Sequence, residues 1–344
     1  MVESPPPAFP SLDKARLKPV AGLLMTPNGV EIIYLRSKVD ASMVTDTASG
    51  RCPVTSGNYR ESLYRSSYGG SRYMTAQKVL DRTKIAHLRG SEARAFIRAG
   101  DWRGPTTGMA HGWAQANLVI LPHSYAEHFS SFCRLNSQAC PVLDVTEPGS
   151  AEPLQVAPGA DLRVDIPRYR IYRHGVFVEE VETITPLWSA NLVSFLLGCS
   201  FTVEAALLRA GLPLRHLEVG HTVSMYRTNR ACHAAGPFHG PLVVSMRPIP
   251  NGLVERAISV TERFPKAHGA PVHVGNPSEL GISDLSRPDY GDPVPVHPGD
   301  VPVFWACGVT PQAAAEVAKI ELMITHAPGH MFVTDIRDED LANG

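Results

Sequence analysis

The sequence lacks net charge, because its 32 Lys and Arg residues nearly balance its 33 Asp and Glu residues, giving a formal charge of −1 over 344 residues. A chain so close to neutral offers no broad basic surface for nucleic acid or for an acidic membrane. It also lacks a membrane-spanning run of about 18 apolar residues, since polar residues and glycine interrupt its longest apolar stretch, 192–208. We therefore expect neither a nucleic-acid partner nor a membrane partner.

Several motifs that would identify a function directly are also missing. There is no G-x-x-x-x-G-K-[ST] phosphate loop, no G-x-S-x-G nucleophile turn and no H-E-x-x-H zinc motif. No C-x-x-C pair occurs, so we expect no structural zinc and no bound metal. Cysteines this far apart are expected to be reduced thiols, as in a cytoplasmic protein, with a mitochondrial location as the alternative in a eukaryote.

The first 73 residues contain no His and no Trp, and residues 42–73 also lack Ile and Phe. Such a segment buries too little apolar surface to offset the entropy lost on ordering. We predict one short strand at 30–35 and otherwise a mostly disordered leader, tag or gene-model extension, with Met74 as the natural start. The segment has no apolar core after a basic stretch, so it does not resemble a secretory signal.

Residues 74–344 show the alternation of strands and helices that is typical of an α/β domain. Helices are predicted at 91–99, 124–133, 187–197, 202–210, 253–264 and 310–318. Strands are predicted at 140–145, 242–246, 271–274, 301–306, 321–325 and 331–335, with a hairpin within 165–181 around His174-Gly175. Ser91 and Thr310 are the predicted N-caps of two of these helices.

Two cysteines stand beside predicted helix starts. Cys199 and Ser200 lie in a joint between two predicted helices, 187–197 and 202–210, and Glu204 follows. A helix dipole there would stabilise a thiolate, although a buried small residue in a tight junction is an equal alternative. Cys307-Gly308 follows the predicted strand 301–306 and precedes the helix that starts at Thr310, where free N–H groups would bind a carboxylate. An ordinary strand–turn–helix joint is the alternative.

Histidine and arginine supply the remaining candidates. His268 and His273 flank Gly269 and Pro271 in a rigid segment, where they would act as acid, base or metal ligands. Arg227 and Arg247 each end an apolar stretch, which suits bidentate recognition of a carboxylate. The alternatives are solvated loop histidines and arginines that tie down loops. His326, beside Pro328-Gly329, is interpreted as a loop residue.

Taken together, eight segments resemble the putative hydro-lyase family, long a domain of unknown function, which includes the D-glutamate cyclase domain. They are residues 104–122, 198–204 (G-C-S-F-T-V-E), 225–229 (M-Y-R-T-N), 243–248, 268–275 (H-G-A-P-V-H-V-G), 281–285, 288–292 and 302–312 (P-V-F-W-A-C-G-V-T-P-Q). The resemblance implies two interlocked subdomains, a three-layer αβα sandwich and a smaller two-layer α+β unit. It also implies a lyase that expels water, as when D-glutamate cyclises to 5-oxo-D-proline.

The sequence departs from this family at two places. Ala190 and Asn191 replace an acidic pair, and Thr222-Val223-Ser224 replaces Asn-Val-Pro. If the acidic pair takes part in catalysis, the substrate differs or the activity is lost.

Cyclisation requires a base, an activated carboxyl and a route for water to leave. The predicted catalytic groups are Cys199, Glu204, His268, His273 and Cys307, with the cysteines as thioester-forming nucleophiles. The predicted substrate-binding groups are Arg227, Arg247, Ser200, Gly308 and Thr310. The scheme needs no cofactor and leaves a homo-oligomer open. The alternatives are a hydratase or dehydratase of another small carboxylic acid, or a non-catalytic protein that binds an acidic metabolite.

Overall fold

The computed structural model describes residues 20–26, 29–35 and 84–342, and the chain divides into two units, 1–70 and 71–344. In the first unit, strands β1 (Val20–Thr26) and β2 (Gly29–Leu35) pair antiparallel. The strand predicted at 30–35 is confirmed by β2, whereas β1 was not predicted. Most of the segment predicted to be disordered, and Met74 itself, lie outside the described residues.

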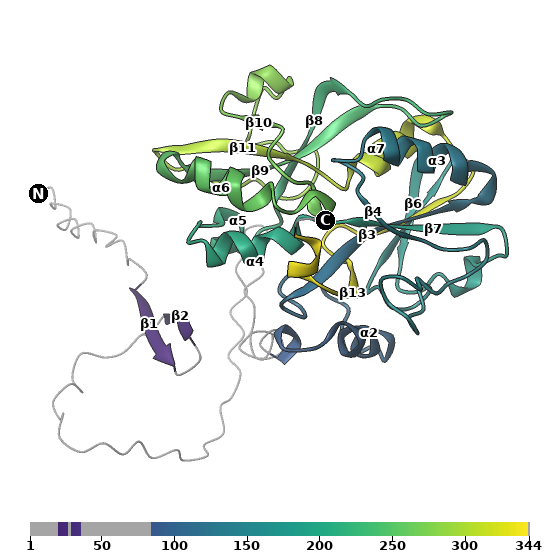
Figure 1. The fold of residues 1–344 in the computed structure, drawn as a ribbon, viewed down its shortest axis with the longest axis horizontal. Coiled ribbons are helices and arrows are strands. Elements are labelled where there is room, and N and C mark those ends of the chain that lie inside the picture. The colour runs from purple at the N-terminus through teal and green to yellow at the C-terminus, as the bar shows by residue number, and fades with distance from the viewer. Residues whose placement is uncertain (1–19, 27–28, 36–83, 343–344) are drawn as a thin grey trace, which may run out of the picture. The chain divides into compact units, whose positions relative to one another are not determined.

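The second unit contains two antiparallel sheets (Figure 1). The seven-stranded sheet has the order β4-β7-β3-β12-β5-β6, with β13 also pairing with β3. Its strands are β3 (Trp113–Pro122), β4 (Val142–Val145), β5 (Tyr169–Arg173), β6 (Val176–Val181), β7 (Leu192–Gly198), β12 (Met323–His326) and β13 (Phe332–Arg337). The four-stranded sheet, of order β10-β11-β9-β8, has strands β8 (Ser224–Ala231), β9 (Pro241–Pro250), β10 (His273–Val274) and β11 (Asp300–Ala306).

Helices cover both sheets, which confirms the α/β class; the division into two interlocked subdomains stays a prediction. The helices are α2 (Gly90–Arg98), α3 (His123–Leu135), α4 (Phe201–Arg209), α5 (Arg215–Glu218), α6 (Val254–Thr261) and α7 (Thr310–Ala318). Short 3-10 turns are η1 (Thr185–Leu187), η2 (Asn251–Leu253), η3 (Pro265–Ala267), η4 (Pro277–Leu280) and η5 (Asp338–Leu341). Helices α5, α6 and α7 all contact β9, and α4 packs on α6 and β3. Among the described residues, no helix is long and apolar enough to cross a bilayer.

The helix predicted at 187–197 is wrong, because η1 ends at Leu187 and the strand β7 begins at Leu192. Strand β7 is buried at every position and pairs with β3 on one side and β4 on the other. A continuous apolar run has no period, so the sequence alone does not separate a buried strand from a buried helix. The joint that carries Cys199 therefore connects a strand, not a helix, to α4.

The two predicted N-caps are wrong for local reasons. The cap of α2 is Arg89, whose N–H donates 2.7 Å to the Glu92 carboxylate, so Ser91 lies inside the helix. The cap of α7 is Val309, and the Thr310 hydroxyl instead donates to the Cys307 carbonyl at 2.7 Å. Both caps are displaced by one or two residues, within the usual variation of a helix end.

Two predicted strands also differ in extent or burial. Strand β9 continues through Pro248 to Pro250. Its pairing with β8 ends at Met246, and beyond that residue only β11 among the described strands pairs with it, so the two prolines, which have no N–H, remove no hydrogen bond to β8. The strand predicted as buried at 140–145 is the sheet edge β4, where Val142 and Val145 are exposed.

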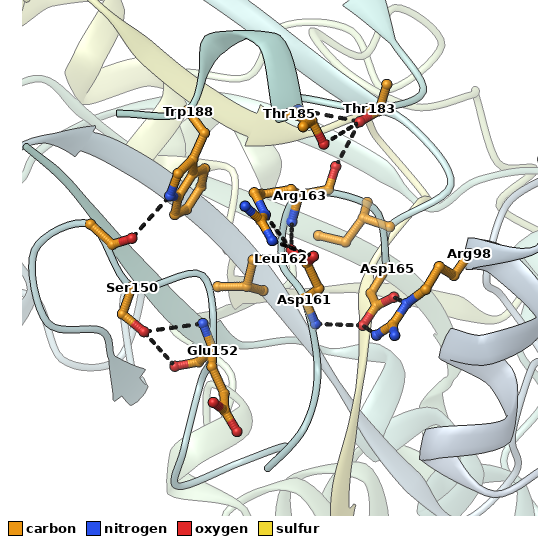
Figure 2. A network of polar contacts seen from close by, with 12 residues as sticks. Arg98, Ser150, Glu152, Asp161, Leu162, Arg163, Asp165, Thr183, Thr185 and Trp188 are labelled. Atoms are coloured by element: carbon orange, nitrogen blue, oxygen red, sulfur yellow. Dashed lines mark hydrogen bonds and ion pairs between the residues drawn. The ribbon is translucent and has the colours of Figure 1, made fainter. Parts of the chain in front are cut away.

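The apolar core lies on both faces of the seven-stranded sheet. One face packs Phe129, Phe132 and Phe195 with residues of α7. The other packs Leu162, Ile166 and Tyr169 against β3, β7 and β12. Beside this second cluster, the buried Asp165 carboxylate accepts two hydrogen bonds of 2.7 Å from Arg98 and one from the Asp161 N–H (Figure 2). The hairpin predicted within 165–181 is confirmed, since β5 and β6 pair antiparallel on either side of His174-Gly175.

Candidate active site

A narrow cavity of about 40 Å³ is lined by residues from both sheets. Asn117 comes from β3 and His326 from the end of β12, both in the seven-stranded sheet. Met225 comes from β8 in the four-stranded sheet. The other residues that line it are Cys199, Ser200, Phe201, Thr222, Val223, His268, Cys307, Gly308, Val309, Pro328, Gly329 and Met331. Five of the predicted site residues therefore meet here: Cys199, Ser200, His268, Cys307 and Gly308.

The two cysteines occupy matching positions, each directly after a strand and just before a nine-residue helix. Cys199 follows β7, its carbonyl accepts from the Thr202 N–H at 3.2 Å, and its Sγ accepts from the Phe201 N–H at 3.5 Å. Cys307 follows β11, its carbonyl accepts from the Thr310 N–H at 3.0 Å, and its thiol bonds the Val309 N–H. The same strand–Cys–helix joint is thus built once from each sheet.

The residue after each cysteine has a main-chain N–H without a hydrogen-bond partner in the described part of the chain. These N–H groups belong to Ser200 and Gly308, and both residues line the cavity. The first turns of α4 and α7 follow directly, and the positive ends of their dipoles favour an anion. Two residues that line the cavity therefore have main-chain N–H groups of the kind that bind carboxylate oxygens.

Both thiols are protonated near neutral pH. Burial raises the pKa of Cys199 to about 12 and that of Cys307 to about 11, even though N–H bonds and Arg247 act in the opposite direction. A helix dipole alone would stabilise a thiolate at either cysteine. In the structure, the loss of solvation outweighs it.

His268 is held as a neutral base. It follows η3 with a φ of 78° and is fully buried, and its Nδ1 lies 2.9 Å from the Gln138 carbonyl oxygen. A carbonyl only accepts, so we infer that Nδ1 carries the hydrogen and that Nε2 keeps a free lone pair. Burial lowers the pKa of His268 to about 4, so the ring is neutral at pH 7.

His326 has the opposite tautomer. The Leu118 N–H donates to its Nδ1 at 3.1 Å, a shorter contact than the 3.4 Å between Nδ1 and the Leu118 carbonyl oxygen. Nδ1 is therefore the acceptor and Nε2 carries the hydrogen. Burial lowers the pKa of His326 to about 4. The interpretation of His326 as a loop residue is wrong, because it is the last residue of β12 and lines the cavity.

Asn117 is another cavity residue that was not predicted. Its Nδ2 donates to the Gly198 carbonyl at 2.6 Å, and a Cβ on Gly308 would lie 2.1 Å from the same nitrogen. A Cβ on Gly198 would lie 1.7 Å from the Lys266 carbonyl oxygen. Both glycines therefore permit a close approach within the protein. The only sequence signal for Asn117 was a polar residue inside an apolar run.

Arg247 and Glu204 form a buried ion cluster behind the cavity. Arg247 donates to the Glu204 carboxylate at 2.6 Å and to the Ser200 hydroxyl at 3.1 Å, and His216 lies 3.0 Å from the same carboxylate. Burial would raise the pKa of Glu204, but His216 and Arg247 lower it below its usual value. The carboxylate is thus ionised and already paired. Neither residue lines the cavity, but Arg247 holds the hydroxyl of Ser200, which does.

Three further predicted residues lie outside the cavity. Arg227 on β8 is exposed and pairs with Glu316 and Tyr290. His273 on β10 bonds the Asn276 carbonyl at 2.8 Å. Thr310 is fully buried, and its hydroxyl ties α7 to Cys307, just after β11, and to Val243 in β9. In the ranges that the structure describes, no group of three His, Cys, Asp or Glu side chains is placed to hold a metal.

Known proteins match this chain over the same region. The D-glutamate cyclase family model matches residues 193–335, a range that contains every cavity residue named above except Asn117. A "Putative hydro-lyase" of Stutzerimonas stutzeri is 59% identical over 259 residues, covering 75% of this chain and 98% of the relative. A "Putative hydro-lyase" of Rubrobacter xylanophilus is 60% identical over 250 residues, covering 73% and 96%.

A third relative, "Putative hydro-lyase YcsI" of Bacillus subtilis, is 58% identical over 251 residues, covering 73% of this chain and 98% of the relative. Among solved structures, a nitrogen repressor-like protein of Methanococcus jannaschii aligns with 72% of this chain and 98% of its own, at 10% identity and a TM-score of 0.30. A similarity that low supports no argument about fold or function.

Proposed function

Because the chain belongs to the family of the putative hydro-lyases, we propose that its cavity binds a small amino or carboxylic acid and expels water from it, most simply as a D-glutamate cyclase. The family match over residues 193–335 supports the reaction class. The observation that carries the proposal is the cavity itself, which is lined by Ser200 and Gly308, whose main-chain N–H groups have no partner in the described part of the chain, and by two neutral imidazoles of opposite tautomer.

The proposed reaction is balanced without a cofactor. A bond forms between the amino nitrogen of D-glutamate and the carbon of its side-chain carboxyl, and one carbon–oxygen bond of that carboxyl breaks. The ammonium loses two protons in all, and both leave with the departing oxygen as water. The enzyme therefore has to move protons from nitrogen to oxygen and ends the cycle unchanged.

The residues divide these tasks by their protonation. The Nε2 of His268 takes the two protons from the amino nitrogen one after the other and delivers each of them to the departing oxygen, which leaves as water. The Nε2–H of His326 and the N–H of Gly308 stabilise the oxyanion that develops on the carboxyl. The N–H of Ser200 and the first turn of α4 hold the other carboxylate. Since both thiols are protonated, direct attack by the amine is favoured over a thioester on Cys199 or Cys307.

The replaced acidic pair no longer counts against activity. Ala190 and Asn191 are exposed and precede β7, whereas Gly198 at the other end of the strand leads into the cavity. Seven residues of extended chain span about 23 Å at ~3.3 Å per residue. The replacement of the acidic pair was the main support for a non-catalytic binding protein, and its distance from the cavity weakens that support.

The proposal is tested by following 5-oxoproline formation from D-glutamate and from L-glutamate. His268→Asn keeps a hydrogen-bond donor for the Gln138 carbonyl but removes Nε2, so kcat should fall about 100-fold or more. His273→Asn, outside the cavity, is the matched control and should keep wild-type turnover. If folded wild-type protein turns over neither enantiomer, D-glutamate cyclisation is excluded for this chain.

A second candidate is the hydration or dehydration of another small carboxylic acid. It is favoured by Thr222 and Val223, which line the cavity and belong to the second departure from the family pattern. A panel of hydroxy acids and unsaturated acids separates the two reactions. A hydratase converts a hydroxy acid into an unsaturated acid or the reverse, which changes the absorbance, and it forms no lactam.

A further inference from the structure

A second, wider cavity of about 390 Å³ lies along one face of α4. Phe201, Glu204, Ala205, Leu208 and Arg209 line it, at the i, i+3, i+4, i+7 and i+8 spacing of a single helical face. The opposite wall is formed by the segment 107–113 with Gln115, and by Leu217 and Asp338. Its volume is in the range of small-molecule sites.

Asp338 is the unusual group in this cavity. The residue is 6% exposed, and its Oδ1 has no hydrogen-bond partner among the residues that the structure describes. Its backbone N–H donates to the Gly112 carbonyl at 3.1 Å, which fixes the residue at the start of η5. Burial raises the pKa of Asp338 to about 6 although Arg209 lowers it, so the carboxylate is ionised at pH 7.5. A buried anionic oxygen without a donor is costly unless a ligand supplies one.

Arg209 supplies a positive charge on the same cavity. It is exposed, and it forms no ion pair within the described ranges, although it is near enough to influence Asp338. The two opposite charges therefore face one cavity without neutralising each other directly. Met109, Trp113 and Leu208 give the remaining wall a largely apolar character.

We propose that this cavity binds a zwitterionic amino acid with an aliphatic side chain. The ammonium pairs with Asp338, the carboxylate pairs with Arg209, and the side chain packs on the apolar wall. The ammonium donates a hydrogen bond to the unpaired Oδ1 of Asp338, and the charges of Asp338 and Arg209 are both neutralised by the ligand. Phe201, the first residue of α4, lines the narrow cavity as well, so an amino acid bound here is next to a residue of the candidate active site.

The test is isothermal titration calorimetry on the full chain at pH 7.5 with three matched probes: norleucine, pentylamine and hexanoate. Pentylamine lacks the carboxylate of norleucine, and hexanoate lacks its ammonium. Norleucine should bind about tenfold more tightly than either, because each probe loses one charge pair. Binding of norleucine no tighter than hexanoate, or no binding at millimolar concentration, overturns the proposal.

Variants assign the two charges. Asp338→Asn should weaken norleucine and pentylamine about tenfold and leave hexanoate unchanged, whereas Arg209→Gln should weaken norleucine and hexanoate but not pentylamine. Arg209 is exposed, so its variant folds even if Asp338→Asn does not. Glu339→Gln, at an exposed neighbour outside the cavity, is the control and should bind norleucine normally. His268→Asn should also bind norleucine normally. Loss of norleucine binding in this variant would place the binding site in the narrow cavity and overturn the proposal.

Discussion

The two cavity histidines show how a backbone partner sets the chemistry of a side chain. The Gln138 carbonyl fixes the hydrogen of His268 on Nδ1, while the Leu118 N–H fixes the hydrogen of His326 on Nε2. His268 was predicted from its rigid local segment. His326 was not, since its partner Leu118 is 208 residues away and no local pattern records such a contact.

The same two residues make the fold sensitive to acid. Burial lowers each histidine pKa from 6.5 to about 4. Below pH 6.5 these histidines bind protons in the unfolded chain but not in the folded chain, so their contribution to stability falls between pH 6.5 and 4 and is constant below that. Each histidine accounts for about 3 kcal/mol of this loss.

Urea unfolding at several pH values across that window checks the effect. His326→Asn keeps an acceptor for the Leu118 N–H and cannot be protonated there, so its stability should fall less steeply with decreasing pH than that of the wild type. An unchanged slope would show that His326 is not held neutral by burial.

The cysteines give a second prediction at the residue scale. Because both thiols are protonated, Cys307→Ser and Cys199→Ser should each keep turnover within about tenfold of the wild type, as expected for loss of a neutral contact. Steady-state kinetics on 5-oxoproline formation measures this. Loss of turnover as large as for His268→Asn would instead support a thioester on that cysteine.

At the scale of elements, the strand–Cys–helix joints depend on glycine. Gly308→Ala places a methyl group against Asn117, so we expect about 1–3 kcal/mol of destabilisation from overpacking and lower activity from a displaced Asn117. Gly252→Ala is the control, because nothing lies within 4 Å of its added Cβ and its φ is not positive. Thermal unfolding and the turnover assay together measure both effects. Equal behaviour of the two variants would show that the contact with Asn117 is unimportant.

Elements with a clear period or a clear stop were predictable. The helices α3, α4, α6 and α7, the hairpin β5–β6 and strands β11 and β12 lie close to their predicted ranges. Strand β7 was missed because burial on both faces removes the alternation that marks a strand.

The cavity was predictable only in part, for a related reason. Cys199, His268 and Cys307 stand beside local signals, whereas the pairing of Glu204 with Arg247 depends on contacts across the fold.

At the scale of the whole molecule, the reaction should need only the second unit. Every residue named for either cavity lies within 107–338, inside the unit 71–344. A chain that starts at Met74 should therefore unfold within about 2 °C of the full chain and cyclise D-glutamate at the same rate. Differential scanning calorimetry and the turnover assay measure this. A large loss of either would assign residues 1–73 a structural role.

The two joints also have a consequence for folding. The narrow cavity brings together residues as far apart as Asn117 and Met331, and the two cysteine joints belong to different sheets. Contacts between such distant parts of a chain form slowly, because long loops must close first. During refolding, helix and strand signals should therefore recover before enzymatic activity, and the lag between them would measure how late the two sheets meet around the cavity.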